Sequence, residues 1–131
     1  MTTNMISILV GILISIESSG GTDLRRGDGG RAAGALQMWR CAVDEANRIE
    51  RIYARRFDRP ARRWSYEDRH CIAASIQMCE LTLIWHYRRG VTDPVELACR
   101  WRNPYSRTSP SYRRKVKERM EAFKLKKGAD L

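Results

Sequence analysis

The sequence lacks the cysteine and histidine spacings that usually hold a metal ion. No CxxC pair occurs, and the two histidines, His70 and His86, do not complete a ligand set. We therefore expect no metal and no organic cofactor. Each cysteine stands among apolar residues, which favours small, buried, reduced side chains, whereas disulfides would require an oxidising compartment. The cysteines are Cys41, Cys71, Cys79 and Cys99.

The sequence also lacks an apolar run long enough to cross a membrane. The stretch Met5–Ile16 has 12 residues, whereas a helix needs about 20 to span a bilayer, so we expect no stable membrane insertion. Residues 1–4 carry no basic side chain and no A-x-A-like cleavage site follows, which argues against a signal peptide. We interpret the stretch as a buried core helix, with a signal peptide or a membrane anchor as the alternatives. Its small residues recur every four positions and predict a narrow face for close helix packing: Ser7, Gly11 and Ser15.

No segment shows the sustained alternation of apolar and polar residues that predicts a half-buried strand. There is no internal repeat and no long linker, and 131 residues suit one domain with one core. We therefore expect a single all-α domain, residues 1–131, of five or six helices. The predicted helices are residues 5–16, 36–53, 65–89, a short one from 94, and 110–126, with loops at 18–34, 55–64 and 103–109.

Several helix boundaries are marked by residues with special backbone preferences. Gly20 and Gly21 are placed to end the first helix in left-handed conformations. Ser65, with Asp68 three residues later, predicts an N-terminal cap for the third helix. Pro94 suits the first position of the helix that follows.

The charge balance is strongly basic. Lys and Arg number 25 against 15 Asp and Glu, for a net charge of +10. Such a surface attracts polyanions, which include nucleic acid, anionic lipid and the anionic polymers of a bacterial wall. We interpret the arginine pairs as solvated faces and three tryptophans as core: Arg55-Arg56, Arg62-Arg63 and Arg88-Arg89, and Trp39, Trp64 and Trp85.

Glu17 is the one acidic residue in the first 22 positions, and it stands between the apolar helix and a glycine-rich loop. Burial and the partial negative charge of the helix carbonyls are both expected to raise the pKa of its carboxyl group. A carboxylic acid that is protonated near neutral pH suits glycosidic cleavage, because the leaving oxygen must gain a proton. Position alone also fits an inert, partly solvated glutamate at a helix end.

Four short motifs bear on the role of Glu17 in addition to its position. Glu17-Ser18 ends the hydrophobic helix, and Gly34-Ala-Leu-Gln37 is expected to open the next one. The run Ala98–Asn103 ends a later helix, and Tyr112-Arg-Arg-Lys-Val116 begins the last. In this order they resemble the signature of soluble lytic transglycosylases and goose-type lysozymes, within the lysozyme-like superfamily. The resemblance runs from about residue 5 to residue 123, and it implies a compact lysozyme-like helical fold that cleaves the glycan strands of bacterial peptidoglycan.

The resemblance also implies roles for particular residues. Glu17 would be the general acid and then the general base. Gln37 would hydrogen-bond the sugar or its acetamido group, and Asn103 would hold the substrate or orient Glu17. Ser18 and Tyr112, from the first and last motifs, are expected to bind substrate with them.

The sequence departs from the family pattern beside Asn103. Arg102 stands where an aromatic residue usually precedes the Asn, and Pro104 replaces a small residue. Stacking on the sugar would then come from Tyr105 or Trp101, and the sequence does not decide between them.

Two reactions stay open. A lytic transglycosylase uses one carboxyl group, which protonates the bridging oxygen and then helps the 6-hydroxyl of muramic acid to close a 1,6-anhydro ring. An inverting hydrolase needs a second carboxylate about 6.5–9.5 Å from the first. Asp23 and Asp28 are the nearest candidates, although Asp28 in its glycine-rich loop equally suits a turn bonded to its own backbone. We favour the transglycosylase.

Other classes of function compete with this interpretation. The basic segment 113–119 suits a nucleic-acid-binding helix, which would leave the loop after Glu17 unexplained. A membrane-active lysis protein would place Met5–Ile16 in lipid. If the chain cleaves glycan, its size and its lack of an export signal and of a wall-binding module indicate a monomeric bacteriophage enzyme with no specific nucleic-acid partner. Such an enzyme would reach the periplasm and cell wall from the host cytoplasm or from the virion.

Overall fold

The computed structural model describes residues 2–21, 24–102 and 109–129, with the side chains of residues 4–21, 24–27, 29–102 and 109–124. This part of the chain is all-α, which confirms the predicted fold class. It contains no strand, and one isolated bridge pairs Ala33 with Met38. The helices are α1 (Thr2–Ser18), α2 (Arg40–Arg56), α3 (Ile72–Arg88), α4 (Pro94–Arg102) and α5 (Pro110–Ala129), with 3-10 turns η1 (Asp28–Gly30) and η2 (Tyr66–His70).

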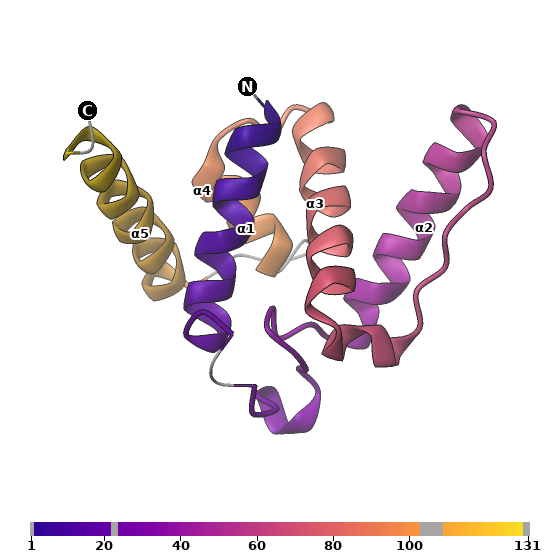
Figure 1. Cartoon of the computed structure of the whole chain (residues 1–131), viewed down its shortest axis with the longest axis horizontal. Coiled ribbons are helices and arrows are strands. Elements are labelled where there is room, and N and C mark those ends of the chain that lie inside the picture. Colours follow the sequence, from indigo (N-terminus) through magenta and orange to yellow (C-terminus); the bar gives the residue numbers. More distant parts are fainter. Residues whose placement is uncertain (1, 22–23, 103–108, 130–131) are drawn as a thin grey trace.

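Helix α3 is the centre of the packing. It contacts α1, α2 and α4, while α1 also contacts α4 and α5. In Figure 1, α5 lies on the outer side of α1 and α2 lies beyond α3, so that α1 and α3 stand between them. The loop that follows α1 lies at the same end of the molecule as the first turns of α2 and α3.

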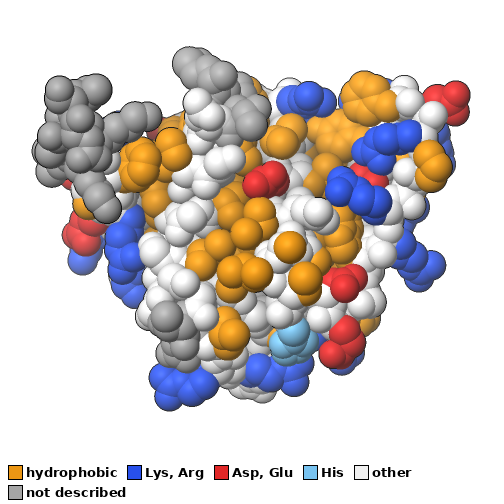
Figure 2. Space-filling view, in the orientation of Figure 1, with side chains coloured by type: hydrophobic (Ala, Val, Ile, Leu, Met, Phe, Trp, Pro, Cys, Tyr) orange, Lys and Arg blue, Asp and Glu red, His pale blue; other side chains and the backbone are white. Residues whose placement is uncertain are grey.

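Helix α1 buries one side because its apolar residues recur at helical spacing. Ile6, Leu9, Val10 and Leu13 are at most 3% exposed, and burying one such side chain contributes about 1.5–3 kcal/mol. The interpretation of this stretch as a core helix is confirmed. Within the described residues, no helix combines the length and the apolar character needed to cross a membrane. Figure 2 shows apolar side chains gathered over α1 and α3, with Lys and Arg mostly at the margins of this face.

The narrow face predicted for close packing of α1 is wrong. Ser7 and Gly11 are exposed, and a Cβ on Gly11 would meet no atom of the described structure within 4 Å. The Oγ of Ser15 donates to the carbonyl oxygen of Ile12 at 2.6 Å and accepts from Nη1 of Arg119 at 2.7 Å. Burial of the larger apolar side chains, rather than close backbone approach, therefore orients α1.

Two predicted helix starts are wrong. Helix α2 begins at Arg40 and not at Leu36, because residues 33–38 form a tight turn closed by hydrogen bonds between Ala33 and Met38. Ser65 and Asp68 do form a cap, with the Ser65 N–H donating to Asp68 Oδ2 at 2.8 Å. That cap opens η2, however, and α3 begins only at Ile72.

The starts of α4 and α5 agree with the sequence. Pro94 opens α4 behind Asp93, whose Oδ2 accepts from the Glu96 N–H at 3.0 Å. Pro110 opens α5 behind Ser109. In both places a short polar residue accepts hydrogen bonds from helix N–H groups that have no partner inside the helix.

The interpretations of the cysteines and tryptophans are each right in part. Cys79 and Cys99 are buried as expected, whereas the other two free cysteines are exposed: Cys41 and Cys71. Trp64 and Trp85 are buried as expected, whereas Trp39 is 37% exposed and lies beside Arg31. Local apolar neighbours in the sequence therefore do not by themselves decide burial at helix ends and turns.

The six arginines of the three pairs are all exposed, which confirms their interpretation as solvated faces, and Arg88 and Arg89 also lie against buried rings. The guanidinium of Arg88 lies 5.6 Å from the ring centroid of Tyr53, and that of Arg89 lies 4.4 Å from the ring of Trp85. These rings form a second small core with Ile49, between α2 and α3. Cation–π contacts of this kind contribute about 0.5–1 kcal/mol at exposed sites.

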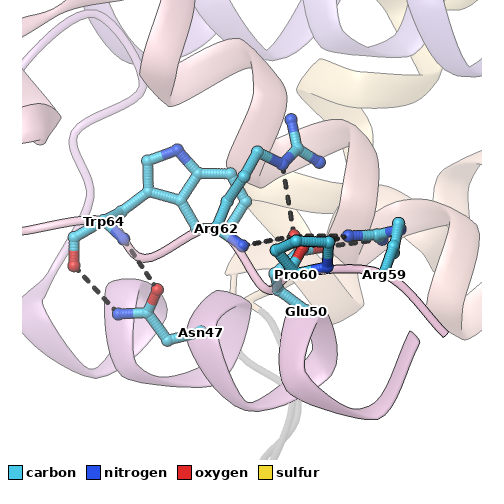
Figure 3. A network of polar contacts seen from close by, with 6 residues as sticks. All are labelled: Asn47, Glu50, Arg59, Pro60, Arg62 and Trp64. Carbon is cyan, nitrogen blue, oxygen red and sulfur yellow. Dashed lines mark hydrogen bonds and ion pairs between the residues drawn. The ribbon is translucent and has the colours of Figure 1, made fainter. Parts of the chain in front are cut away.

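A buried carboxylate holds the extended segment between α2 and η2 against α2. The fully buried Glu50 accepts from Nη1 and Nη2 of Arg59 at 2.8 and 2.9 Å, and from the N–H and Nε of Arg62 at 2.8 and 3.2 Å (Figure 3). The bonds from Arg59, with those from Arg62, lower the pKa of Glu50 to about 2 despite its burial. Asn47 adds bonds to the backbone N–H and carbonyl of Trp64, both at 2.9 Å.

Candidate active site

Glu17 lies one residue before the end of α1. The helix stops because Ser19, Gly20 and Gly21 have positive φ angles of 52°, 74° and 91°, a region in which glycine is least strained. The prediction that the two glycines end the helix is confirmed. The Glu17 side chain is only 9% exposed, so its carboxylate lies at the border of the apolar core.

Arg102, the last residue of α4, reaches across to Glu17. Its Nη1 lies 3.3 Å from Oε2 of Glu17, although the two residues are 85 positions apart. This distance is longer than the roughly 2.7–2.9 Å of a strong charge-assisted hydrogen bond. The Arg102 side chain is 37% exposed. The residue that departs from the family pattern therefore brings a partly solvated cation to the predicted catalytic carboxylate.

Tyr112, in the first turn of α5, forms another wall of the site. It is buried, and its ring centroid lies 5.4 Å from the guanidinium carbon of Arg102. Burial first, and then the Glu17 carboxylate, raises the pKa of the Tyr112 phenol well above its usual range. The hydroxyl thus lies close to Glu17, although within the described residues it makes no hydrogen bond of regular geometry. The neighbouring Arg113 pairs with Glu96 and ties α5 to α4 at this level.

Helix α3 contributes an apolar wall through Cys79. The thiol is fully buried, and burial, followed by the charges of Glu80 and Glu17, raises its pKa well above the usual range. The thiol is therefore neutral and provides no cation or strong donor for the carboxylate. The local sequence predicts only that Cys79 is buried, and nothing in it indicates that Cys79 lies near Glu17.

The surroundings of Glu17 act on its carboxylate in opposite directions. Burial beside Cys79 and Tyr112 disfavours the charged form, because the charge loses contact with water. The guanidinium of Arg102 favours the charged form. The two influences therefore oppose one another at this carboxyl group.

Ser18 has a structural task in this arrangement. It is 2% exposed, and its Oγ donates to the Ile14 carbonyl oxygen at 3.1 Å and accepts from the Gly21 N–H at 3.0 Å. These bonds close the end of α1 and the turn that follows it. Contact between Ser18 and a substrate would first require breaking them.

Gln37 also uses its side chain inside its own loop. Its Oε1 accepts from the Gly27 N–H, and its Nε2 donates to the Gly34 carbonyl oxygen, both at 2.9 Å. Gln37 has a positive φ of 47° and ends the tight turn rather than opening a helix. The sugar contact implied by the family resemblance would compete with these bonds.

A buried arginine packs against the loop that contains Gln37. Arg69 in η2 is 2% exposed, and its Nη1 donates to the carbonyl oxygens of Arg31 and Met38, both at 3.1 Å. A Cβ at Gly34, where φ is 81°, would overlap the carbonyl oxygen of Arg69, so only glycine fits there. Burial lowers the pKa of Arg69. This role of Arg69 could not be predicted from the sequence, because no local pattern distinguishes Arg69 from the other arginines.

Some predicted site residues lie outside the described structure. Asn103, Pro104 and Tyr105 belong to the undescribed segment 103–108, and Asp23 is likewise undescribed. The backbone of Asp28 forms part of η1, but its side chain is outside the described set. The two proposed reactions are therefore not separated by the position of a second carboxylate.

Within the described residues, no group of three or more His, Cys, Asp or Glu side chains is placed to hold a metal ion. Comparisons with protein-family models, curated proteins and solved structures found no significant match to the chain. What the chain does must therefore be argued from the residues around Glu17.

Proposed function

We propose that this protein cleaves the bond between N-acetylmuramic acid and N-acetylglucosamine in bacterial peptidoglycan, as a lytic transglycosylase with Glu17 as its acid and base. One observation carries the proposal. Three segments that resemble family motifs, far apart in the sequence, converge on one carboxylate: Glu17 at the end of α1, Arg102 at the end of α4 and Tyr112 at the start of α5.

The proposed reaction needs a single carboxyl group. Protonated Glu17 gives its proton to the oxygen that bridges the two sugars, and the bond from that oxygen to C1 of muramic acid breaks. The resulting carboxylate then removes the proton from the 6-hydroxyl of the same muramic acid. The freed oxygen bonds to C1, the 1,6-anhydro ring closes, and Glu17 is protonated again.

The surroundings suit the two halves of this cycle. Burial of the Glu17 carboxyl beside Cys79 and Tyr112 favours the acid needed in the first step. Arg102 at 3.3 Å favours the carboxylate needed in the second. Tyr112 is a positioning residue, because it is too buried to offer a broad surface to a sugar but lies against the group that reacts.

A hydrolytic muramidase is the alternative reaction at the same site. It would use Glu17 with Asp28, and a water molecule would replace the 6-hydroxyl as nucleophile. The products distinguish the two reactions, because hydrolysis leaves reducing ends and transglycosylation leaves 1,6-anhydro ends.

The decisive experiment treats purified peptidoglycan with the wild-type protein and with Glu17→Gln, and identifies the released fragments by mass spectrometry. We expect muropeptides with 1,6-anhydro ends from the wild type and none from the variant. Reducing ends would replace the transglycosylase by the hydrolase. Equal release by both proteins would refute the role of Glu17.

Binding to nucleic acid is a second candidate, favoured by the net charge of +10 and by the exposed basic residues of α5: Arg114, Lys115, Lys117 and Arg119. It predicts an affinity for duplex DNA that falls steeply with salt and that Glu17→Gln leaves unchanged. If the protein releases no fragments but shows such binding, nucleic-acid binding replaces glycan cleavage as the proposed function.

A further inference from the structure

The arginines of the chain concentrate around the end of α2, away from the candidate active site. Residues 51–63, together with the two residues at the end of α3, contain eight exposed arginines and one acidic residue, Asp58. We call this surface the arginine lobe, and its arginines are Arg51, Arg55, Arg56, Arg59, Arg62, Arg63, Arg88 and Arg89. In Figure 1 the last turns of α2 and the segment that follows form the outer edge beyond α3, on the opposite side of the molecule from α5.

Most of the positive charge of the arginine lobe is not paired with a carboxylate. Arg59 and Arg62 share the buried Glu50. The other six arginines of the lobe form no ion pair with any carboxylate of the described residues. The lobe is therefore a concentrated patch of positive charge, which attracts a surface or polymer of negative charge.

The arginine lobe is also suited to phosphate groups in particular. Its basic residues are all arginines, and the first lysine of the sequence is Lys115. The guanidinium carbon of Arg88 lies 5.6 Å from the ring centroid of Tyr53, and that of Arg89 lies 4.4 Å from the ring centroid of Trp85. A guanidinium that lies on an aromatic face directs its in-plane N–H groups outward, where two of them match two oxygens of one phosphate.

An apolar side chain lies among these charges. Phe57, the first residue after α2, is 58% exposed, more than any other large hydrophobic side chain of the described residues. Its ring stacks on that of Tyr53, with 6.0 Å between the centroids, and this contact holds it in place. In Figure 2, Lys and Arg side chains lie next to hydrophobic ones over the last turns of α2, at the upper right. The exposed part of the ring would gain free energy by entering an apolar phase.

We propose that the arginine lobe binds the surface of an anionic phospholipid bilayer, with its arginines on lipid phosphates and the Phe57 ring inserted at the boundary between headgroups and acyl chains. Each Lys or Arg near such a surface strengthens binding about fivefold. An inserted apolar side chain adds to that attraction. The inference goes beyond glycan cleavage and does not depend on it, because the lobe shares no residue with the site around Glu17.

The aromatic residues favour a bilayer over nucleic acid. Single strands are held by several exposed rings on which successive bases stack. Phe57 is the one exposed ring of the arginine lobe, since Tyr53, Trp64 and Trp85 are buried. Sequence-independent binding to a duplex uses its phosphates, and these offer no apolar phase to a phenyl ring. A bilayer presents phosphates and hydrocarbon side by side, and so it matches both features of the lobe.

The test measures how the whole chain binds lipid vesicles, by co-sedimentation. Vesicles of phosphatidylcholine are compared with vesicles in which half of the lipid is phosphatidylglycerol. We expect the anionic vesicles to be bound at least about a hundredfold more tightly, because several arginines act together. The affinity should fall as salt is added, since salt screens charges outside the surface layer.

A pair of double variants locates the charge effect. Arg55→Gln with Arg56→Gln should weaken binding to the anionic vesicles about tenfold to thirtyfold. The matched control is Arg114→Gln with Lys115→Gln, which removes the same charge from exposed positions of α5. It should weaken binding less than about threefold, because charges further than a Debye length from the bilayer are screened. The comparison separates the lobe from the net charge of the chain.

A second pair of variants tests insertion of the ring. Phe57→Ala should weaken binding to the anionic vesicles about fivefold, because it removes the apolar group that enters the bilayer. Leu24→Ala is the matched control, since Leu24 is 54% exposed in the loop after α1, and its affinity should equal that of wild type. Urea unfolding of each variant checks that the fold is retained.

Every outcome decides the inference. Losses confined to the Arg55/Arg56 and Phe57 variants, with an unchanged free energy of unfolding, support it. The absence of any preference for anionic vesicles, equal losses in the two double variants, or an unchanged affinity of Phe57→Ala would each overturn it. Binding of oligothymidylate or of a DNA duplex through Arg55 and Arg56, without binding to vesicles, would make nucleic acid the partner of the lobe and overturn it as well.

Discussion

Among the described residues, Glu50 and Glu17 are both largely shielded from solvent and both pair with arginines, but they are held very differently. Glu50 on α2 is fully buried and accepts short hydrogen bonds from Arg59 and Arg62, which are 9 and 12 residues further along the chain. Glu17 at the end of α1 retains slight exposure, and Arg102 approaches it at 3.3 Å from 85 residues away.

The difference indicates which charge is structural and which can react. Several short donors on one carboxylate favour its charged form, and they lower the pKa of Glu50 to about 2. A long contact to a partly exposed arginine stabilises a charge without preventing its neutralisation. A carboxyl group that must both give and take a proton needs the second kind of surroundings.

The largest expected effect separates the two residues by activity. Glu17→Gln should lower the rate of glycan cleavage by about 10²–10⁴-fold, because it removes general acid and base catalysis. It should change the free energy of unfolding by less than about 1 kcal/mol. Glu50→Gln, assayed where it is fully folded, should retain cleavage. A comparable loss of activity in both variants would contradict the distinction between a reactive Glu17 and a structural Glu50.

The next effect separates them by stability. Glu50→Ala should lower the free energy of unfolding by about 3 kcal/mol, since it removes a buried partner from two arginines. Urea unfolding followed by circular dichroism measures this value. The matched control is Glu45→Ala on the same helix, because Glu45 pairs with Arg48 near the surface. The loss of that exposed pair should cost about 0.5 kcal/mol or less.

The pH dependence of stability should show the same contrast. The pKa of Glu50 is about 2 in the folded protein and 4.5 in its unperturbed state. The unfolded chain therefore binds the extra proton, and the stability that Glu50 contributes is present above pH 4.5 and lost as the pH falls toward 2. Glu50→Gln should flatten this part of the profile of unfolding free energy against pH. An unchanged slope would contradict the pairing.

The smallest expected effect concerns two buried tyrosine hydroxyls. Those of Tyr112 and Tyr53 both lack a regular hydrogen bond within the described structure, so replacing either tyrosine by Phe should change the free energy of unfolding by less than about 1 kcal/mol. Only Tyr112 lies against Glu17. Tyr112→Phe should lower kcat about threefold to tenfold through loss of positioning, while Tyr53→Phe leaves kcat unchanged. Equal kcat values for the two variants would remove Tyr112 from the site.

Helix boundaries set by local chemistry were predictable from the sequence. Gly20 ends α1, and Pro94 and Pro110 begin helices, because backbone preferences act within a few residues. The turn at residues 33–38 was missed, because the apolar residues around it suit a helical pattern. Only its packing on Arg69 shows why the chain turns there.

Only one residue of the candidate site, Glu17, could be predicted from the sequence, and the residues that surround it could not. Glu17 is conspicuous because it follows an apolar helix and precedes glycines. In the sequence, Arg102 stands out only as a departure from a family pattern, and Cys79 only as a side chain expected to be buried. Ser18 and Gln37 matched a motif, but in the structure their side chains bond to the backbone of their own segments.

By itself, the sequence determined that the described chain is helical, that α1 is buried and that a carboxylate stands at its end. These properties follow from periodicity and from interactions between near neighbours. Only the tertiary structure decided that Arg102 and Tyr112 face Glu17, and that Arg59 and Arg62 lock Glu50. The burial and pairing of a charge depend on how helices pack over long sequence separations, and no local pattern encodes that packing.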